Sequence, residues 1–169
     1  CLRLVGSEMC IRDSDKNECY ANSDFIIIAT PTNYDVSTGS FDTSSVKNVI
    51  SDILENNRNS VIIIKSTIPL GFTDRMRSMF NKTDIFFSPE FLRESNALYD
   101  NLYPSRVVVG DISKEADIFA NILVECSKKN KNDVSIFKMK SKEAEAVKLF
   151  ANTFLAMRIS FFNELDSFS

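Results

Sequence analysis

Short apolar runs alternate along the chain with longer segments in which apolar residues recur every three or four positions. Such runs are typical of strands that are buried on both faces of a parallel sheet. They fall at residues 24–29, 61–64, 85–87, 106–109 and 134–137. The segments between them have the period of helices with one apolar face. This alternation predicts an α/β fold with a partial doubly wound (Rossmann-like) parallel sheet.

The last segment has a different pattern, which predicts a long helix from Ser141 to about Ser167. Ser141 is a good helix cap, and the segment has no glycine or proline. Apolar residues surround most of the helix axis, as in helices buried between domains or subunits. We therefore expect the sheet to be followed by the start of a long buried helix. The few polar residues against this apolar background are Lys148, Asn152 and Asn163. They form either a solvated edge of the helix or a line of hydrogen-bond donors that faces the oxygen atoms of a ligand.

Polar side chains lie three positions after the ends of three apolar runs, at Thr32, Thr67 and Glu90. The carboxyl ends of parallel strands form one edge of a sheet, where ligands bind in open α/β folds. Glu94 follows Glu90 by four residues, so one helical turn would place both carboxylates on the same side. A solvated acidic turn is the alternative for the two glutamates. The convergence of hydroxyl and carboxyl groups nevertheless favours a binding site at this edge.

Composition narrows the chemistry of this site. The chain has no histidine, which excludes a His-based triad, a histidine general base and a His-containing metal site. The cysteines lack CxxC spacing, so we predict no metal, and their scatter suits a reducing cytoplasm. The net charge of −3 does not indicate nucleic-acid binding, and no apolar run approaches the length of a membrane span. None of the four glycines forms the GxGxxG turn that binds a pyrophosphate.

Four blocks together resemble the UDP-glucose/GDP-mannose dehydrogenase family: ATPTNYD, IKSTIPLGFT, FFSPEFLRESNALYDNLYPSRVVVG and EAEAVKLFANTFLAMRISFFNELDSFS. The resemblance runs almost continuously from about residue 15 to residue 169. It implies that residues 15–140 are the C-terminal part of an NAD-binding domain, and that residues 141–169 begin a central helical dimerisation domain. Residues 1–14 do not match, and we expect a foreign leader that adds no packed strand or helix.

Members of this family oxidise the C6 hydroxyl of a UDP-hexose to a carboxylate through two hydride transfers to NAD, an aldehyde and a cysteine thioester. The resemblance therefore implies NAD-dependent oxidation of UDP-glucose to UDP-glucuronate. It implies NAD as the cofactor, UDP-glucose as the substrate and a homodimer as the complete assembly. GDP-mannose and UDP-N-acetyl sugars stay open as alternative substrates.

The resemblance also implies roles for individual residues. The catalytic residues would be Thr67, Glu90, Lys148 and Asn152. Thr67 and Glu90 would hold the water that cleaves the thioester, whereas Lys148 and Asn152 would stabilise charge on the C6 oxygen. The cofactor would contact Thr32, Thr67 and Glu94. The substrate would contact Glu90, Phe91, Leu92, Arg93, Glu94, Lys148 and Asn152.

The sequence departs from the family pattern at both ends. The family's nucleophilic cysteine lies in a glycine-rich loop that would follow Ser169, and the N-terminal unit with the glycine fingerprint is replaced by residues 1–14. We therefore expect an internal fragment that is inactive by itself, because both the pyrophosphate turn and the thiol are missing. The alternative class is a non-catalytic fragment that binds a nucleotide sugar or dimerises.

Overall fold

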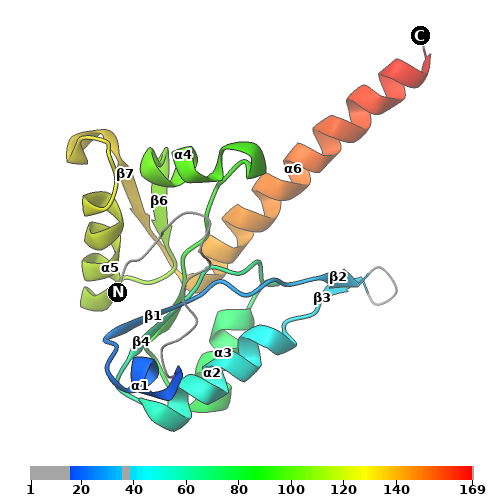
Figure 1. The fold of residues 1–169 in the computed structure, drawn as a ribbon. Coiled ribbons are helices and arrows are strands. Elements are labelled where there is room, and N and C mark those ends of the chain that lie inside the picture. The colour runs from blue at the N-terminus through cyan, green and yellow to red at the C-terminus, as the bar shows by residue number, and fades with distance from the viewer. Residues whose placement is uncertain (1–15, 36–38, 169) are drawn as a thin grey trace.

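A computed structural model describes residues 16–35 and 39–168, so the expectations for residues 1–14 lie outside the described part (Figure 1). The helices are α1 (Lys16–Ala21), α2 (Ser44–Asn56), α3 (Phe72–Phe80), α4 (Ala97–Leu102), α5 (Lys114–Glu125) and α6 (Ser141–Phe168), with 3₁₀ turns η1 (Glu94–Asn96) and η2 (Lys131–Asp133). The strands are β1 (Phe25–Ile28), β2 (Tyr34–Asp35), β3 (Ser40–Phe41), β4 (Val61–Ile64), β5 (Ile85–Phe87), β6 (Arg106–Val109) and β7 (Ser135–Lys138).

The parallel sheet predicted from the apolar runs is confirmed, but burial on both faces is not found in β1, where Ile27 is 50% exposed, or in β7, whose four residues are all exposed. β1, β4 and β5 form a parallel sheet in that order, and β6 pairs with β7, also in parallel. Two hydrogen bonds join β5 to β6: Gly110 N donates to Phe87 O at 2.7 Å, and Ser88 Oγ donates to Val108 O at 2.9 Å. The short antiparallel pair β2–β3 was not predicted, because each strand has only two residues.

The core is divided between the two faces of this sheet. Ile62 and Ile64 of β4 pack with α2 and α3 in one cluster, whereas Val61 and Ile63 pack with Phe119 and the rest of α5 in another. This alternation follows from the pleat of the strand. Figure 1 shows the same division, with α5 beside β6 and β7 and away from α2 and α3.

Some local expectations are wrong. The helical period of residues 72–80 and 116–126 predicts that Met79 and Cys126 face the core, but Met79 is 54% exposed and Cys126 is exposed. Met79 is in the last turn of α3, and Cys126 is the C-cap residue that follows α5. Of the two cap residues that the sequence offers for α5, Ser113 and Asp111, Ser113 is the cap, with its hydroxyl accepting from Ala116 N. Ser141 does not cap α6, because its buried hydroxyl donates instead to Gly110 O at 2.7 Å.

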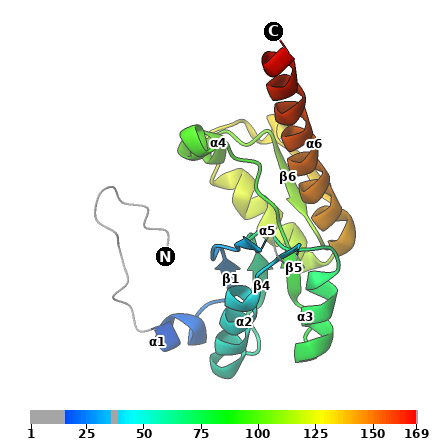
Figure 2. The same ribbon diagram turned by 90° about the vertical axis from the view of Figure 1, so that its right-hand side faces the viewer.

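The long final helix is present, but its predicted burial is not found within this chain. α6 extends beyond all the other elements in two perpendicular views (Figures 1 and 2). From Asn152 to Phe168 every described side chain is exposed. Its exposed apolar residues include Phe150, Phe154, Leu155, Met157, Ile159, Phe161, Phe162 and Leu165. No helix of the described residues is both long and apolar enough to cross a membrane.

Candidate active site

The segments that follow β1, β4 and β5 are bonded to one another at the carboxyl edge of the sheet. Ser66 Oγ donates to Thr30 O at 2.6 Å, which joins the ends of β1 and β4. Ser88 N donates to Ile64 O at 2.9 Å, which joins the ends of β4 and β5. The sequence therefore brings three polar segments together because each follows a buried parallel strand.

A cleft of about 290 Å³, the Thr67 cleft, opens at this edge. Its lining consists of Ala29, Thr30, Pro31, Thr32, Lys65, Ser66, Thr67, Glu90 and Lys148. Thr32, Thr67 and Glu90 meet here as the strand pattern predicted. Lys148 reaches the same cleft from α6, although it is 58 residues away from Glu90 in the sequence. Four of the expected site residues thus surround one space.

Lys148 contacts the backbone of Glu90. Its ammonium nitrogen donates to Glu90 O at 2.5 Å and lies 5.5 Å from the centre of the Phe91 ring. Burial lowers the pKa of Lys148, and the negative charge of Glu90 partly opposes this effect. Two of the expected site residues, Lys148 and Glu90, therefore lie in contact, with the carbonyl oxygen of Glu90 as the bonded atom.

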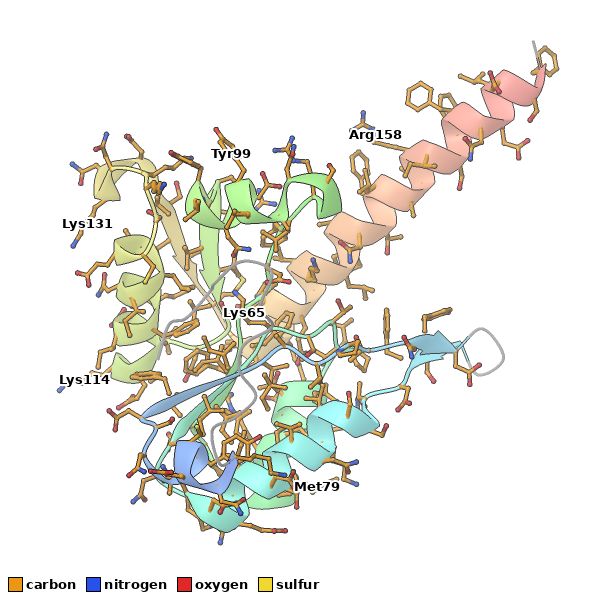
Figure 3. The ribbon with its side chains drawn as sticks, in the orientation of Figure 1. Lys65, Met79, Tyr99, Lys114, Lys131 and Arg158 are labelled. Carbon is orange, nitrogen blue, oxygen red and sulfur yellow. The ribbon has the colours of Figure 1, made fainter. Side chains whose placement is uncertain are left out.

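Lys65 is a site residue that sequence reasoning missed. Its side chain is 15% exposed, and its ammonium nitrogen lies 3.9 Å from Glu90 Oε2. Burial lowers the pKa of Lys65; the carboxylate of Glu90 opposes this shift and the nearby charge of Lys148 adds to it. Figure 3 shows Lys65 at the end of the strands, near the start of α6. Its position directly after the run 61–64 was the signal, because the same rule had selected Thr67 and Glu90.

A second cleft, the Phe91 cleft, adjoins the first and has a volume of about 310 Å³. Its lining comes from the segments 88–93 and 103–108, with Lys65, Asp100, Asn101 and Leu123. Lys65 and Glu90 line both clefts. The guanidinium carbon of Arg106 lies 4.2 Å from the centre of the Phe91 ring, a cation–π contact that fixes this ring in the wall.

The helical turn predicted from Glu90 to Glu94 is wrong. Glu90 to Arg93 have no helical structure, and the 3₁₀ turn η1 begins only at Glu94. The cause is a set of bonds to Asp100 on α4. Arg93 N donates to Asp100 Oδ2 at 2.9 Å, and the Arg93 guanidinium donates to both carboxylate oxygens at 3.0 and 2.7 Å. These bonds lower the pKa of Asp100 to about 2.

The remaining expected residues differ in their positions. Phe91, Leu92 and Arg93 line the Phe91 cleft, but the Arg93 guanidinium is held by Asp100. The backbone of Glu94 lies at the start of η1, next to this segment. Asn152 is exposed on α6, one turn beyond Lys148, and is not among the residues that line either cleft. The structure therefore does not bring Asn152 into the site with the other residues.

Two ammonium groups, one carboxylate and several hydroxyl groups surround the Thr67 cleft. Lys65 and Lys148 can stabilise negative charge on a ligand oxygen, and Glu90 can accept a proton or orient a water. Within the described ranges, no group of three or more Cys, Asp or Glu side chains could hold a metal ion.

The chain is similar to known proteins along most of its length. Residues 6–130 match the NAD binding domain of the UDP-glucose/GDP-mannose dehydrogenase family, and residues 142–169 match its central domain. The first match begins inside the segment 1–14, for which we expected no resemblance. The chain is 51% identical over 157 residues to a UDP-glucose 6-dehydrogenase of Campylobacter jejuni, covering 92% of this chain and 39% of that protein. It is 49% identical over 173 residues to a UDP-glucose 6-dehydrogenase of Streptococcus pneumoniae, covering 98% of this chain and 43% of that protein.

A solved structure shows the same architecture. The UDP-glucose dehydrogenase of the archaeon Pyrobaculum islandicum aligns with a TM-score of 0.73 and 31% identity, over 88% of this chain and 36% of that one. This confirms the Rossmann-like fold class predicted from the sequence. The chain spans about two fifths of the length of the curated relatives described above. Because both domain matches and the fold agree, the chain belongs to the UDP-glucose/GDP-mannose dehydrogenase family.

Proposed function

We propose that the full-length protein containing this chain is an NAD-dependent UDP-glucose 6-dehydrogenase, which oxidises the C6 hydroxyl of UDP-glucose to a carboxylate. The observation that carries the proposal is the meeting of Lys148 with Glu90 at the carboxyl edge of the sheet, at 2.5 Å. The identity of 51% and 49% to two proteins named as UDP-glucose 6-dehydrogenases supports the choice of substrate.

Oxidation of an alcohol requires loss of the hydroxyl proton, so negative charge develops on the C6 oxygen. Lys148 is suited to stabilise this charge because it is half-buried, where electrostatic interactions are stronger than in water. Lys65 adds a second positive charge to the same cleft. Asn152 lines neither cleft in this chain but lies one turn beyond Lys148 on α6, and in our proposal it joins Lys148 in this role when substrate is bound.

The second half of the proposed reaction is hydrolysis of a thioester, formed on a cysteine of the full-length protein outside this chain. Thr67 and Glu90 line the cleft together, and a water between them would be oriented by a hydroxyl and a carboxylate. Glu90 would accept a proton from this water as it attacks. The segment from Phe91 to Glu94 would contact the nucleotide sugar, together with Glu90, Lys148 and Asn152.

The residues at the ends of β1 and β4 fit NAD. The hydroxyl-bearing Thr32 and Thr67 line an open cleft whose wall also carries the cation Lys65, so hydrogen-bond donors and a positive charge are available to a polar dinucleotide. In our proposal Thr32, Thr67 and Glu94 hold the cofactor. NAD, when bound there, supplies the acceptor for the hydride.

The exposed apolar surface of α6 supports a homodimer of the full-length protein. A single chain leaves Phe154, Phe161 and Phe162 more than half exposed, and large exposed apolar patches mark interaction sites. In our proposal residues 141–169 begin the central domain that buries this surface, residues 15–140 belong to the cofactor domain, and the protein works in the cytoplasm.

The test is a substrate panel with the purified full-length protein. NAD would be supplied with UDP-glucose, GDP-mannose or UDP-N-acetylglucosamine, and NADH and sugar products would be quantified. We expect two NADH for each UDP-glucose consumed, with UDP-glucuronate as the product. Turnover of GDP-mannose in preference to UDP-glucose would replace the proposed substrate, and absence of NADH with every sugar would refute the proposed activity.

A further inference from the structure

Glu145 of α6 is a buried carboxylate that the reaction proposed above does not use. Its residue exposure is 1%, and it is the charged residue among the buried polar side chains of the described residues. Burying a carboxylate is unfavourable unless its oxygens are fully bonded. The partners of Glu145 therefore indicate what this burial achieves.

All the bonds of Glu145 are to the first turn of α3. Oε2 accepts from Gly71 N at 2.5 Å, and Oε1 accepts from Thr73 N at 2.9 Å and from Thr73 Oγ1 at 2.7 Å. Gly71 is the N-cap residue of α3, adopts φ of 77°, and has no side chain with which to cap the helix. Glu145 supplies this cap from another helix, and its negative charge faces the positive end of the α3 dipole.

This contact joins two segments that carry site residues. Thr67 precedes Gly71 by four residues, in the connection from β4 to α3. Lys148 follows Glu145 by three residues on α6, so the two side chains lie on neighbouring positions of one helix surface. Both views show α6 beginning beside α3 (Figures 1 and 2).

α6 has other contacts in its first half: Ala144 is buried in the core, and Lys142 Nζ lies 3.6 Å from Asp74 Oδ2 of α3. Ser141 Oγ bonds to Gly110 O, and Lys148 Nζ bonds to Glu90 O. From Asn152 onward the helix has no buried described side chain. An ammonium group has three N–H donors, so Lys148 can keep its bond to Glu90 O and also donate to a substrate oxygen. That single bond lies at the tip of a long flexible side chain. The contact between Glu145 and α3 consists of three hydrogen bonds close to the helix axis, so it is better suited to fix the position of α6.

We propose that Glu145 is a positioning residue. By binding the first turn of α3, it fixes the position of α6 and so holds the Lys148 side chain at the Thr67 cleft, next to Thr67. The expected effect of Glu145 on turnover rests on the proposed function. Its expected effect on the position of Lys148 does not. A buried carboxylate that only stabilised the fold would have no specific link to Lys148.

A double-mutant cycle in the full-length protein tests this link. Glu145→Gln keeps the shape of the side chain but turns one acceptor oxygen into a donor toward an α3 N–H group. We expect kcat with UDP-glucose to fall about 10- to 100-fold, because small displacements of a catalytic group are costly. In a Lys148→Ala background the same change should lower kcat by less than about twofold, since sites that act through one another are not additive. An equal fold-loss in both backgrounds overturns the inference.

A second readout does not depend on activity. The pH dependence of amine labelling at Lys148, followed by mass spectrometry, reports the pKa that burial lowers. Lys65 and Glu90, the charged groups that face Lys148 from the β4 and β5 ends, stay unchanged in the variants. We expect Glu145→Gln to move the pKa of Lys148 back toward its ordinary value, because the ammonium becomes more exposed. An unchanged pKa of Lys148 overturns the inference, even if the protein forms no NADH.

Two further variants complete the test. Glu143→Gln is the matched control, because Glu143 is an exposed glutamate of the same helix whose carboxylate bonds to Lys140 N. It should leave both kcat and the labelling of Lys148 unchanged. Thr73→Val removes one of the donors to Glu145, the Thr73 hydroxyl. This variant replaces Glu145→Gln in both measurements if Glu145→Gln does not fold. It should shift both readouts in the same direction by a smaller amount, and no shift in a folded Thr73→Val protein contradicts the proposal.

Discussion

The ammonium of Lys65 lies 3.9 Å from a carboxylate oxygen of Glu90, at the boundary between the Thr67 and Phe91 clefts. The two groups come from the ends of neighbouring parallel strands, β4 and β5. Lys65 is 15% exposed in its side chain and Glu90 is 40% exposed, so the cation is the more buried partner. This pair places a positive charge between the two spaces where ligands can enter.

Removal of this charge should impair the proposed reaction. We expect Lys65→Met to lower kcat with UDP-glucose by about 10-fold or more, because a preorganised charge at the reacting oxygen would be lost. Lys65→Arg should retain more activity, since it keeps the charge but not the compact shape. Lys114→Met is a suitable control, because Lys114 lies on α5 away from Lys65 (Figure 3). Full activity of Lys65→Met would exclude Lys65 from the site.

The same substitution should make the protein more stable. Burial is the largest influence on the pKa of Lys65 and lowers it, so the folded state disfavours the charged form. This penalty is fully present below the lowered pKa and decreases as pH rises through it. Methionine has a similar unbranched shape without a charge. We therefore expect Lys65→Met to raise Tm at pH 7, with a smaller gain at alkaline pH; a lower Tm at pH 7 would contradict this.

Asp100 should make the segment after β5 sensitive to acid. Its pKa is lowered to about 2 by hydrogen bonds from Arg93, so its contribution to stability is present above the ordinary pKa. That contribution is lost as pH falls from about 4 toward 2. Unfolding free energies of wild type and Asp100→Asn should therefore differ at pH 5 to 7 and converge in acid. Asp24→Asn, at an exposed position before β1, is the control; a difference that persisted near pH 2 would contradict the assignment.

Asp100→Asn should also weaken substrate binding in the full-length protein. Arg93 would lose the charge of its partner, and the segment that lines the Phe91 cleft would be held less firmly. A contact that is equally strong in ground and transition states affects KM more than kcat. We therefore expect KM for UDP-glucose to rise with little change in kcat, measured from initial rates of NADH formation. A fall in kcat at constant KM would show that this segment acts on the chemistry instead.

Gly110 is a position where the backbone leaves no room for a side chain. A Cβ there would lie 2.9 Å from Phe87 O and 3.1 Å from the Cβ of Ala144. We expect Gly110→Ala to destabilise the protein by about 1–3 kcal/mol, because β5 or α6 must shift. Among the described residues, a Cβ at Gly39 would meet the Tyr34 hydroxyl alone, at 3.9 Å, so Gly39→Ala should cost mainly the strain of its φ of 63°, about 1 kcal/mol. Urea unfolding would compare them, and equal losses would contradict the packing argument.

The sheet could be predicted because its strands carry their own signal. β4 is fully buried, so its sequence is apolar throughout, and the polar residues after it mark the edge of the sheet. The same logic found Thr67 and Glu90, and it would have found Lys65 if cations had been considered beside hydroxyl and carboxyl groups. The approach of Lys148 to Glu90 came from the family resemblance, because α6 lies far away in the sequence.

The features that were missed depend on contacts between distant residues. Glu145 looks like an ordinary exposed helix residue in the sequence, yet its partners lie more than 70 positions away, in α3. The segment after Glu90 is extended because Asp100 binds Arg93, and helical periodicity gives no information about that bond. The burial of α6 was inferred from its apolar surface, which cannot indicate whether this chain or another one covers it.

Lys148 gives the sharpest test of the proposed mechanism. Its ammonium is held at Glu90 O and lines the Thr67 cleft, so a substrate oxygen would meet a cation that is already in place. We expect Lys148→Ala in the full-length protein to lower kcat by about 10²–10³-fold, with a much smaller change in KM, because the charge it stabilises develops only during the reaction. Lys142→Ala, at an exposed lysine two turns earlier on α6, should leave both parameters nearly unchanged. A variant whose KM rises while kcat is preserved would make Lys148 a binding residue and would remove it from the chemical step.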